Sequence, residues 1–215
     1  PRPPHFIDHV PHSRHEQPQS IDKGPNQLSI AVAGDIDQKS DIFLLTDLAR
    51  VLSDKNINVV FHVIGGGRWM PRLETAAPLL TGSCSMQCHG RVDRSRYVGI
   101  LSECHAALVL PGRLNHFPLP VETSDYAAAG LALFLTHDGE LADMVLKAHA
   151  GILTDSLPEE LAAAIGPLAT DPQQIARLRQ ASRKLAETFL DREKLAAKAV
   201  VWLESLAELA PVNPV

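Results

Sequence analysis

The residues of this chain most able to do chemistry lie in the loop 111–120 and in the helix start that follows it. The loop carries Asn115 and His116, and Asp125 follows in the helix start, so amide, imidazole and carboxylate groups fall close together. The apolar run 106–110 before the loop is short, branched and ended by Pro-Gly, which is typical of a buried strand in a parallel sheet. Because α/β proteins bind ligands where a strand ends and a helix begins, we predict that this is the active-site loop.

A second possible ligand site is the triple glycine 65–67, which follows an apolar run and precedes a helical pattern. Backbone amides in such a turn can hold a phosphate group. The spacing departs from the dinucleotide-binding fingerprint, because Met70 stands where its third glycine falls. A tight turn is therefore the favoured explanation over a nicotinamide dinucleotide site.

Cysteine and histidine residues raise the question of a metal site. Cys84 and Cys88 are separated by three residues and His89 follows directly, but no second close pair follows them. We interpret the three cysteines as small core residues of a protein in a reducing compartment. The amino-terminal segment has histidines without an adjacent cysteine or dense carboxylates, which favours a solvated linker; they are His5, His9, His12 and His15. We predict no metal.

From about Leu28 the chain alternates between short apolar runs and helical patterns, which indicates βαβ units around a parallel sheet. The predicted strands are 28–33, 59–64, 85–89, 106–110, 131–135 and 151–153. The predicted helices between them are 41–53, 70–80, 94–104, 121–129 and 140–148, followed by a helical region of 158–168, 172–190 and 191–209. This order predicts an α/β fold: a Rossmann-like, doubly wound parallel sheet with helices on both faces and further helices at its carboxyl end.

The helix predicted over 172–190 is amphipathic, because apolar residues recur at spacings of three and four. These residues are predicted to pack against the domain; they are Leu178, Ala181, Leu185 and Phe189. Its basic residues are predicted to form a solvated face; they are Arg177, Arg179, Arg183 and Lys184.

Composition narrows the class of protein. The 215 residues are 45% hydrophobic, enough to bury a sizeable core, and the net charge of −5 argues against general nucleic-acid binding. No apolar run reaches the roughly 18 residues of a membrane span, and the start lacks a signal-peptide layout, so we expect a cytoplasmic protein. We divide the chain into a linker (1–26), one domain (27–209) and a tail (210–215).

The order of these features resembles the carboxyl-terminal domain of group 1 glycosyltransferases of the GT-B fold. The resemblance covers about residues 28 to 206. It rests on the motifs Val32-Ala-Gly-Asp35, Val63-Ile-Gly-Gly-Gly67, Cys88-His-Gly-Arg-Val92, Leu108-Val-Leu-Pro-Gly112, Phe117-Pro-Leu-Pro120, Asp125-Tyr-Ala-Ala-Ala-Gly130, Thr136-His-Asp-Gly-Glu140 and Gly151-Ile-Leu153.

The resemblance implies a bacterial domain that binds a nucleotide-sugar donor as a substrate, with no cofactor. It also implies a separate amino-terminal domain, absent from this chain, that binds the acceptor and through which the protein contacts a membrane peripherally. The last helix of such proteins crosses back to that domain, so we expect exposed apolar surface around Trp202 and Leu203. Asp125 looks like the counterpart of the carboxylate that holds the ribose hydroxyls.

The donor motif departs from the family pattern at several positions. The first motif glutamate falls on Phe117, or on Asn115 in the other alignment, and neither is a carboxylate. Glu122 is acidic and near, but it is too close to Asp125 to replace that glutamate. Asp35 occupies the position of an arginine that neutralises the diphosphate, so it would repel that group.

The motifs match the family while several donor-site residues depart from it, and this combination is compatible with two functions. The first is retaining transfer of a hexose, in which Lys39 and backbone amides stabilise the departing nucleoside diphosphate and Asn115 or His116 contacts the sugar. The resemblance adds to the predicted substrate-binding residues, which are Gly34, Gly67, Arg91, Phe117, Leu119, Glu122 and Asp125. The second is a degenerate domain that serves assembly or partner binding without turnover. In either case we expect this chain alone to show no sugar transfer.

The surroundings expected for Asp125 depend on its role. If it binds ribose, its carboxylate should be open to a ligand in a cleft between the strand ends at Leu110 and Leu135. If it serves the fold alone, it should cap the short helix that runs to Ala129. His137, in the loop after the next strand, is a further candidate for contact with a phosphate or a sugar.

Overall fold

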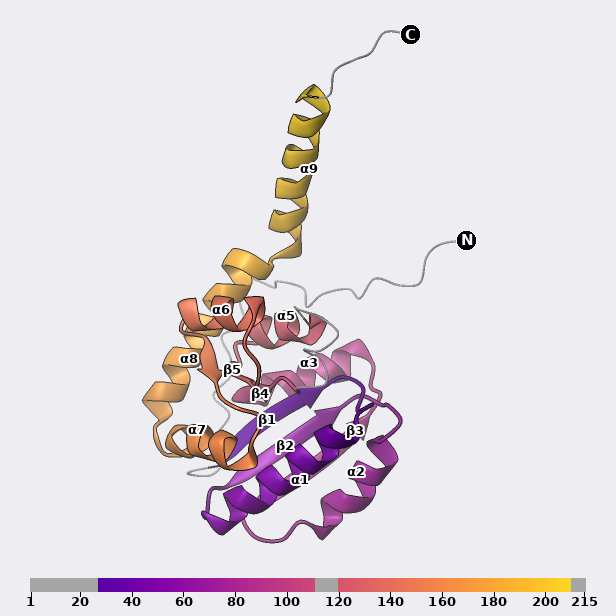
Figure 1. Ribbon diagram of the computed structural model, residues 1–215, viewed down its shortest axis with the longest axis vertical. Helices are drawn as coiled ribbons and strands as arrows, with labels where there is room; N and C mark the ends of the chain where they lie inside the picture. The colour runs from indigo at the N-terminus through magenta and orange to yellow at the C-terminus, as the bar shows by residue number, and fades with distance from the viewer. Residues whose placement is uncertain (1–26, 111–119, 210–215) are drawn as a thin grey trace.

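The computed structural model describes residues 27–110 and 120–209 as an α/β domain with a helical extension (Figure 1). Its six strands form one parallel sheet in the order β3-β2-β1-β4-β5-β6. They are β1 (Leu28–Ala33), β2 (Val59–Ile64), β3 (Cys84–Gly90), β4 (Ala106–Leu108), β5 (Ala132–Leu135) and β6 (Gly151–Leu153). The predicted doubly wound sheet is confirmed.

Helices cover both faces of the sheet. They are α1 (Lys39–Asp54), α2 (Met70–Ala76) with the 3-10 turn η1 (Ala77–Leu79), α3 (Arg94–Ser102), α5 (Val121–Ala128), α6 (Glu140–Lys147), α7 (Pro158–Thr170), α8 (Pro172–Leu185), the π-helical turn η2 (Ala186–Leu190) and α9 (Arg192–Leu209). Buried residues of α1, α2 and α7 belong to one core cluster, and those of α3 and α6 belong to a second, together with Tyr126 of α5. The predicted elements agree with these bounds to within a few residues at each end.

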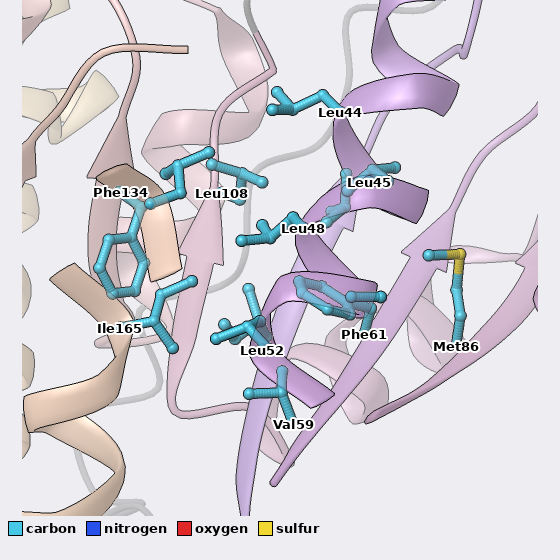
Figure 2. Packing of buried hydrophobic residues seen from close by; sticks show 14 of the residues in the cluster. Leu44, Leu45, Leu48, Leu52, Val59, Phe61, Met86, Leu108, Phe134 and Ile165 are labelled. Carbon is cyan, nitrogen blue, oxygen red and sulfur yellow. The ribbon is translucent and has the colours of Figure 1, made fainter. Parts of the chain in front are cut away.

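Helix α1 is held to the sheet by an apolar stripe with helical spacing. Leu45, Leu48 and Leu52 are fully buried, and Figure 2 shows them beside Phe61 of β2. Spacings of three and four residues keep these side chains on the face of α1 that meets the sheet. Burial of each leucine contributes roughly 1.5–3 kcal/mol, so this stripe fixes the position of α1.

Strand β1 lies at the centre of the sheet, because it pairs with β2 on one side and with β4 on the other. All six of its residues are buried, as expected for a strand covered by helices on both faces. The chain winds outward from β1 toward β3 in one direction and from β4 toward β6 in the other. In sheets of this kind ligands usually bind in the crevice outside the carboxyl ends of the two strands at which the order reverses, and here these strands are β1 and β4.

The prediction that the basic residues of α8 form a solvated face is wrong for two arginines, which bind backbone carbonyls. Arg179 donates from Nε to the carbonyl of Gly130 at 2.9 Å, and Arg183 donates to the carbonyl of Ala128. These carbonyls lie at the carboxyl end of α5, where the helix dipole favours a cation. The prediction that Phe189 packs inward is also wrong, because that side chain is 56% exposed.

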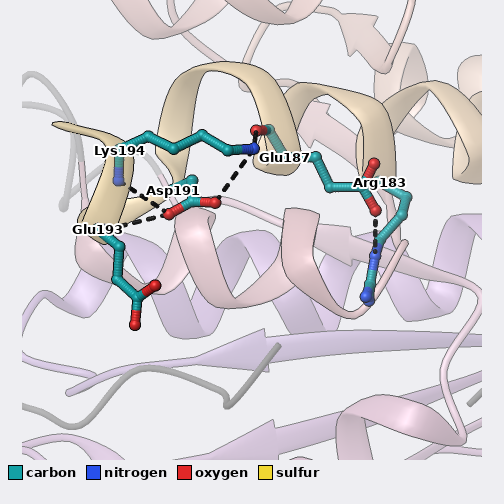
Figure 3. Close-up of polar contacts among 5 residues, drawn as sticks. All are labelled: Arg183, Glu187, Asp191, Glu193 and Lys194. Atoms are coloured by element: carbon teal, nitrogen blue, oxygen red, sulfur yellow. Dashed lines mark hydrogen bonds and ion pairs between the residues drawn. The ribbon is translucent and has the colours of Figure 1, made fainter. Parts of the chain in front are cut away.

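Helix α9 extends away from the sheet (Figure 1), and Asp191 stabilises its start. The carboxylate of Asp191 accepts the backbone N–H of Glu193 and of Lys194, and the Lys194 ammonium lies 3.3 Å from it (Figure 3). Trp202 and Leu203 are exposed, which confirms the expected apolar surface. No helix in the described part of the chain is both long and apolar enough to cross a membrane.

A pair of histidines joins β2 to β3. Nδ1 of His62 and Nε2 of His89 are 3.1 Å apart, and the two rings stack. Burial lowers the pKa of His89 below its ordinary value of 6.5, and Arg96 lowers it further against the opposing effect of Glu103. The folded state therefore disfavours protonation of this imidazole.

We predict that the free energy of unfolding falls as the pH drops from 6.5 through the lower pKa of folded His89, because the unfolded chain binds the proton first. Above 6.5 the imidazole is neutral in both states and contributes no pH dependence. Urea unfolding at about pH 7.5 and about pH 5 measures this loss of free energy of unfolding. The loss between the two pH values should be smaller for His89→Gln than for the wild type. His149→Asn removes an exposed histidine as a control, and an equal loss in all three proteins would contradict the assignment.

Candidate functional site

The loops that follow β1, β2 and β3 interlock at the carboxyl edge of the sheet. The N–H of Gly34 donates to the carbonyl of Ile64, and the N–H of Gly65 donates to that of Gly90, both at 2.8 Å. The N–H of Ile36 reaches the carbonyl of Gly66 at 2.8 Å. These bonds hold the three loops as one rigid surface beside the crevice at β1 and β4.

Glycine is required where these backbones meet. Gly65 has a φ of +143°, and a Cβ atom there would lie 2.0 Å from the carbonyl oxygen of Gly34. Gly67 has a φ of +103°, and its Cβ would lie 2.6 Å from the amide nitrogen of Ile36. Both positions exclude a side chain. This geometry supports the tight-turn explanation of the triple glycine, and binding of substrate by Gly34 and Gly67 stays a prediction.

Asp35 fills the space beside this glycine turn with a carboxylate that already has partners. It accepts the N–H of Gly66 at 3.1 Å and the guanidinium of Arg91 at 2.7 and 2.9 Å. The Arg91 side chain is 72% exposed and that of Asp35 is 36% exposed. The aspartate expected to repel a diphosphate is therefore neutralised by the arginine that was predicted to bind substrate.

Arg94 and Asp125 form a second pair, deeper in the domain. Both carboxylate oxygens of Asp125 accept the Arg94 guanidinium at 3.0 Å, and the Asp125 side chain is only 7% exposed. The expectation of a carboxylate open to a ligand is wrong, because α5 turns Asp125 inward, where a charge needs a partner. The capping alternative is also wrong, since Asp125 lies inside Val121–Ala128.

Two tyrosines near this pair are also buried in the domain, and one of them lies against Arg94. The Arg94 guanidinium carbon lies 5.3 Å from the centroid of the Tyr97 ring. Burial raises the pKa of Tyr97, with smaller contributions from Tyr126 and Asp125, so its phenol stays neutral at ordinary pH. Tyr126 is 1% exposed, and its hydroxyl accepts the N–H of Ala33 at 2.5 Å. This bond fixes α5 to the carboxyl end of β1.

Sequence reasoning missed Arg94 and Tyr126. Asp93 caps α3 by accepting the N–H of Arg96, and an Asp before a helix is a recognisable signal that places Arg94 at the first helical residue. Nothing in the sequence pairs Arg94 with Asp125, because 31 residues and a strand separate them. The hydroxyl of Tyr126 serves a backbone group 93 residues away, which is equally invisible to local patterns.

The other predicted site residues are distributed over several places. Lys39 is the exposed first residue of α1, and its Nζ lies 5.2 Å from the centroid of the Phe43 ring. Glu122 lies in the first turn of α5. Four predicted site residues fall outside the described part of the chain: Asn115, His116, Phe117 and Leu119. The four histidines of the predicted linker also lie outside it. Among the described residues no cluster is suited to a metal ion.

His137 lines an open polar hollow of about 690 Å³ at the carboxyl ends of β5 and β6. Thr136, Asp138 and Thr154 contribute to the same hollow. It lies along the edge of the sheet that carries Gly34 and Asp35, because the ends of parallel strands meet at one edge. This edge therefore offers space and polar groups beside the crevice.

The six-stranded parallel sheet, doubly wound with helices on both faces, defines a Rossmann-like α/β domain. The family model "Glycosyl transferases group 1" matches residues 13–185. The chain belongs to this family, and its fold is that of a GT-B carboxyl-terminal domain. A search of curated proteins finds no match.

Solved structures of the same fold come from several organisms. The catalytic domain of cholesterol-α-glucosyltransferase from Helicobacter pylori is 15% identical with a TM-score of 0.61, over 77% of this chain and 99% of that one. The carboxyl-terminal domain of LpcC, a group 1 glycosyltransferase of Francisella tularensis, is 15% identical with a TM-score of 0.61, over 77% and 87%. Pneumococcal GtfA, an O-GlcNAc transferase solved with UDP and GlcNAc, is 19% identical with a TM-score of 0.62, over 86% of this chain and 36% of its own.

We predict that Arg94→Ala and Asp125→Ala each lower the free energy of unfolding by roughly 2–4 kcal/mol, because each leaves one poorly solvated charge without its partner. The double change Arg94→Met with Asp125→Leu should restore most of this loss, since no charge is left behind. Urea unfolding of the four proteins measures both effects. Arg50→Ala, which breaks an exposed pair with Asp47, is the control and should cost less than about 1 kcal/mol. Equal costs at the two sites would contradict the buried pair.

Proposed function

We propose that this domain binds the nucleoside diphosphate of a nucleotide sugar at the carboxyl edge between β1 and β4, as the donor half of a retaining hexosyltransferase. The reversal of strand order at β1 carries the proposal, because ligands usually bind at such a reversal and the tight glycine loops and Arg91 lie beside it. Family membership supports a donor of this kind, and GtfA, which shares the fold, was solved with UDP. The chain spans 36% of GtfA, so the acceptor site belongs to a further domain in this proposal.

Arg91 is the cation best placed to bind a diphosphate. Its pair with Asp35 is exposed, and exposed pairs contribute only about 0–1 kcal/mol, so an incoming polyanion can displace the carboxylate. A guanidinium also matches two phosphate oxygens at once. Arg94 is unsuited to this role, because leaving buried Asp125 would cost several times more.

The chemical step in this proposal is stabilisation of the departing diphosphate. Breaking the bond from sugar to phosphate leaves negative charge on the phosphate oxygens, which Arg91 and the positive end of α5 would offset. Asn115 and His116, in the segment of sequence between β4 and α5, are the residues we propose to contact the sugar. Lys39 would complete the site from the start of α1.

One observation favours a second function, a non-catalytic domain retained for assembly or partner binding. Asp125, the counterpart of the ribose-binding carboxylate, is fully engaged by Arg94 and buried. A carboxylate that is buried and already accepts a bond at each oxygen leaves a ribose hydroxyl little access. Nucleotide binding by the wild type decides between the two functions.

We predict opposite effects on UDP binding from the two members of the exposed pair. Arg91→Ala should weaken the affinity roughly 10–100-fold, because it removes charge-assisted hydrogen bonds of about 1.5–3 kcal/mol. Asp35→Asn should strengthen it by roughly threefold to tenfold, since it removes a competing anion while keeping an oxygen for the N–H of Gly66. Isothermal titration calorimetry with UDP, GDP and ADP measures these affinities.

Arg96→Ala removes an exposed arginine of α3 outside the site and is the matched control. Its affinity should equal that of the wild type. Unchanged binding in Arg91→Ala, or weaker binding in Asp35→Asn, would contradict the role given to this pair. If neither the wild type nor Asp35→Asn binds any of the three nucleotides, the non-catalytic function is supported instead.

A further inference from the structure

A groove of about 530 Å³ lies between α1 and the α2–η1 segment, which run side by side outside the sheet (Figure 1). Phe43 of α1 and Leu79 of η1 line it and are 52% and 76% exposed. Trp69, at the start of α2, also lines it. Exposed apolar side chains gathered in a hollow of this size are typical of a small-molecule site, whereas scattered ones are ordinary surface.

The charged groups among the groove's described lining residues are cationic, and one of them, Arg50, is paired at 2.8 Å with Asp47. Lys39, Arg50 and Arg72 line it, and among its described lining residues none is acidic. Lys39 lies over the Phe43 ring at 5.2 Å on one wall, and Arg72 lies over the Trp69 ring at 5.7 Å on the other. Each cation is thus held at an aromatic surface, where it meets both an apolar body and an anionic group.

The hydroxyls in the groove are already satisfied by their own helices. Thr46 donates to the carbonyl of Ile42, and Thr75 donates to the carbonyl of Pro71, both at 2.9 Å. The threonines therefore offer the groove little beyond their methyl groups. A ligand rich in hydroxyls would find few partners here, whereas an apolar body with one anionic end matches all the groups that remain.

We propose that the groove binds a single amphiphile that carries an apolar chain and an anionic headgroup of the phosphate type. The complementarity is both apolar, through Phe43, Trp69 and Leu79, and electrostatic, through the cations on its two walls. This groove adjoins the proposed nucleotide site and shares Lys39 with it, but its other lining residues lie on α1, on α2 with η1 and in the residues next to them, and not in the loops that follow β1 and β4. It does not depend on the proposed function.

A single molecule fits this groove better than a bilayer surface or a protein segment. Glu74 of α2 is exposed and the charge of Arg50 is offset by Asp47, so these helices lack the broad cationic surface that an anionic bilayer would need. A volume of about 530 Å³ matches one small ligand. Stable protein partners cover a much larger area, roughly 800 Å² on each side.

The experiment measures tryptophan fluorescence of the whole chain, and every protein in it carries the substitution Trp202→Phe. The chain has two tryptophans, so Trp69 in the groove becomes the sole tryptophan reporter. Decyl phosphate, titrated below its micelle concentration, should change the emission of Trp69 in a saturable way. Decyl maltoside supplies the chain without charge and inorganic phosphate supplies the charge without the chain, and each should bind at least roughly tenfold more weakly.

Two variants and two matched controls locate the binding. Leu79→Asp and Arg72→Glu should each weaken decyl phosphate binding by roughly tenfold or more. Leu157→Asp and Arg177→Glu make the same changes at exposed positions outside the groove and should leave it unchanged. Circular dichroism at the highest amphiphile concentration checks that each protein stays folded, and UDP calorimetry of the groove variants keeps this result separate from the nucleotide site.

Several outcomes would overturn the proposal. They are equal binding of decyl maltoside, no effect of either groove variant, or an emission change that follows unfolding. Binding only to vesicles that contain phosphatidylglycerol, or only to an acidic amphipathic peptide, would assign the groove to a bilayer or to a protein partner and would also overturn it.

Discussion

The position of β1 between β2 and β4 is the constraint on which this structure depends. A strand that is paired on both sides and covered on both faces has no freedom to shift, so its carboxyl end is a fixed point. Gly34 leads out of that end, the glycines after β2 pack against it, and Tyr126 holds α5 to it through the N–H of Ala33. The crevice and everything proposed to act there take their geometry from this strand.

Two arginine–aspartate pairs differ in solvent exposure, and this difference assigns one to the proposed function and the other to stability. The pair of Arg91 and Asp35 is exposed, so water screens it and a ligand can compete for either member. The pair of Arg94 and Asp125 is mostly buried, so breaking it leaves a charge with little solvation. In the proposed function the first pair exchanges partners when the diphosphate binds, whereas the second holds α3 against α5. The same two residue types thus serve different purposes because their exposure differs.

The sequence predicted the fold well and the site only in part. Branched apolar runs such as 59–64, and the glycine or proline that ends most strands, determine where elements begin and end, and these are local signals. The side-chain partners of Asp35 and Asp125 are not local, because each lies on another element. The arginines of α8 were misjudged for the same reason: the carbonyls that they bind belong to the end of α5. Periodicity shows which face is apolar, but it does not show which polar groups a neighbouring helix needs.

The central claim is that the exposed arginine at the carboxyl edge exchanges a carboxylate for a diphosphate. A crystal structure of the chain with UDP tests it most directly. The account predicts UDP in the crevice at β1 and β4, with the Arg91 guanidinium turned from Asp35 onto the phosphate oxygens and the pair of Arg94 and Asp125 intact. UDP bound elsewhere, or bound in the crevice while Arg91 keeps its bonds to Asp35, would contradict the account.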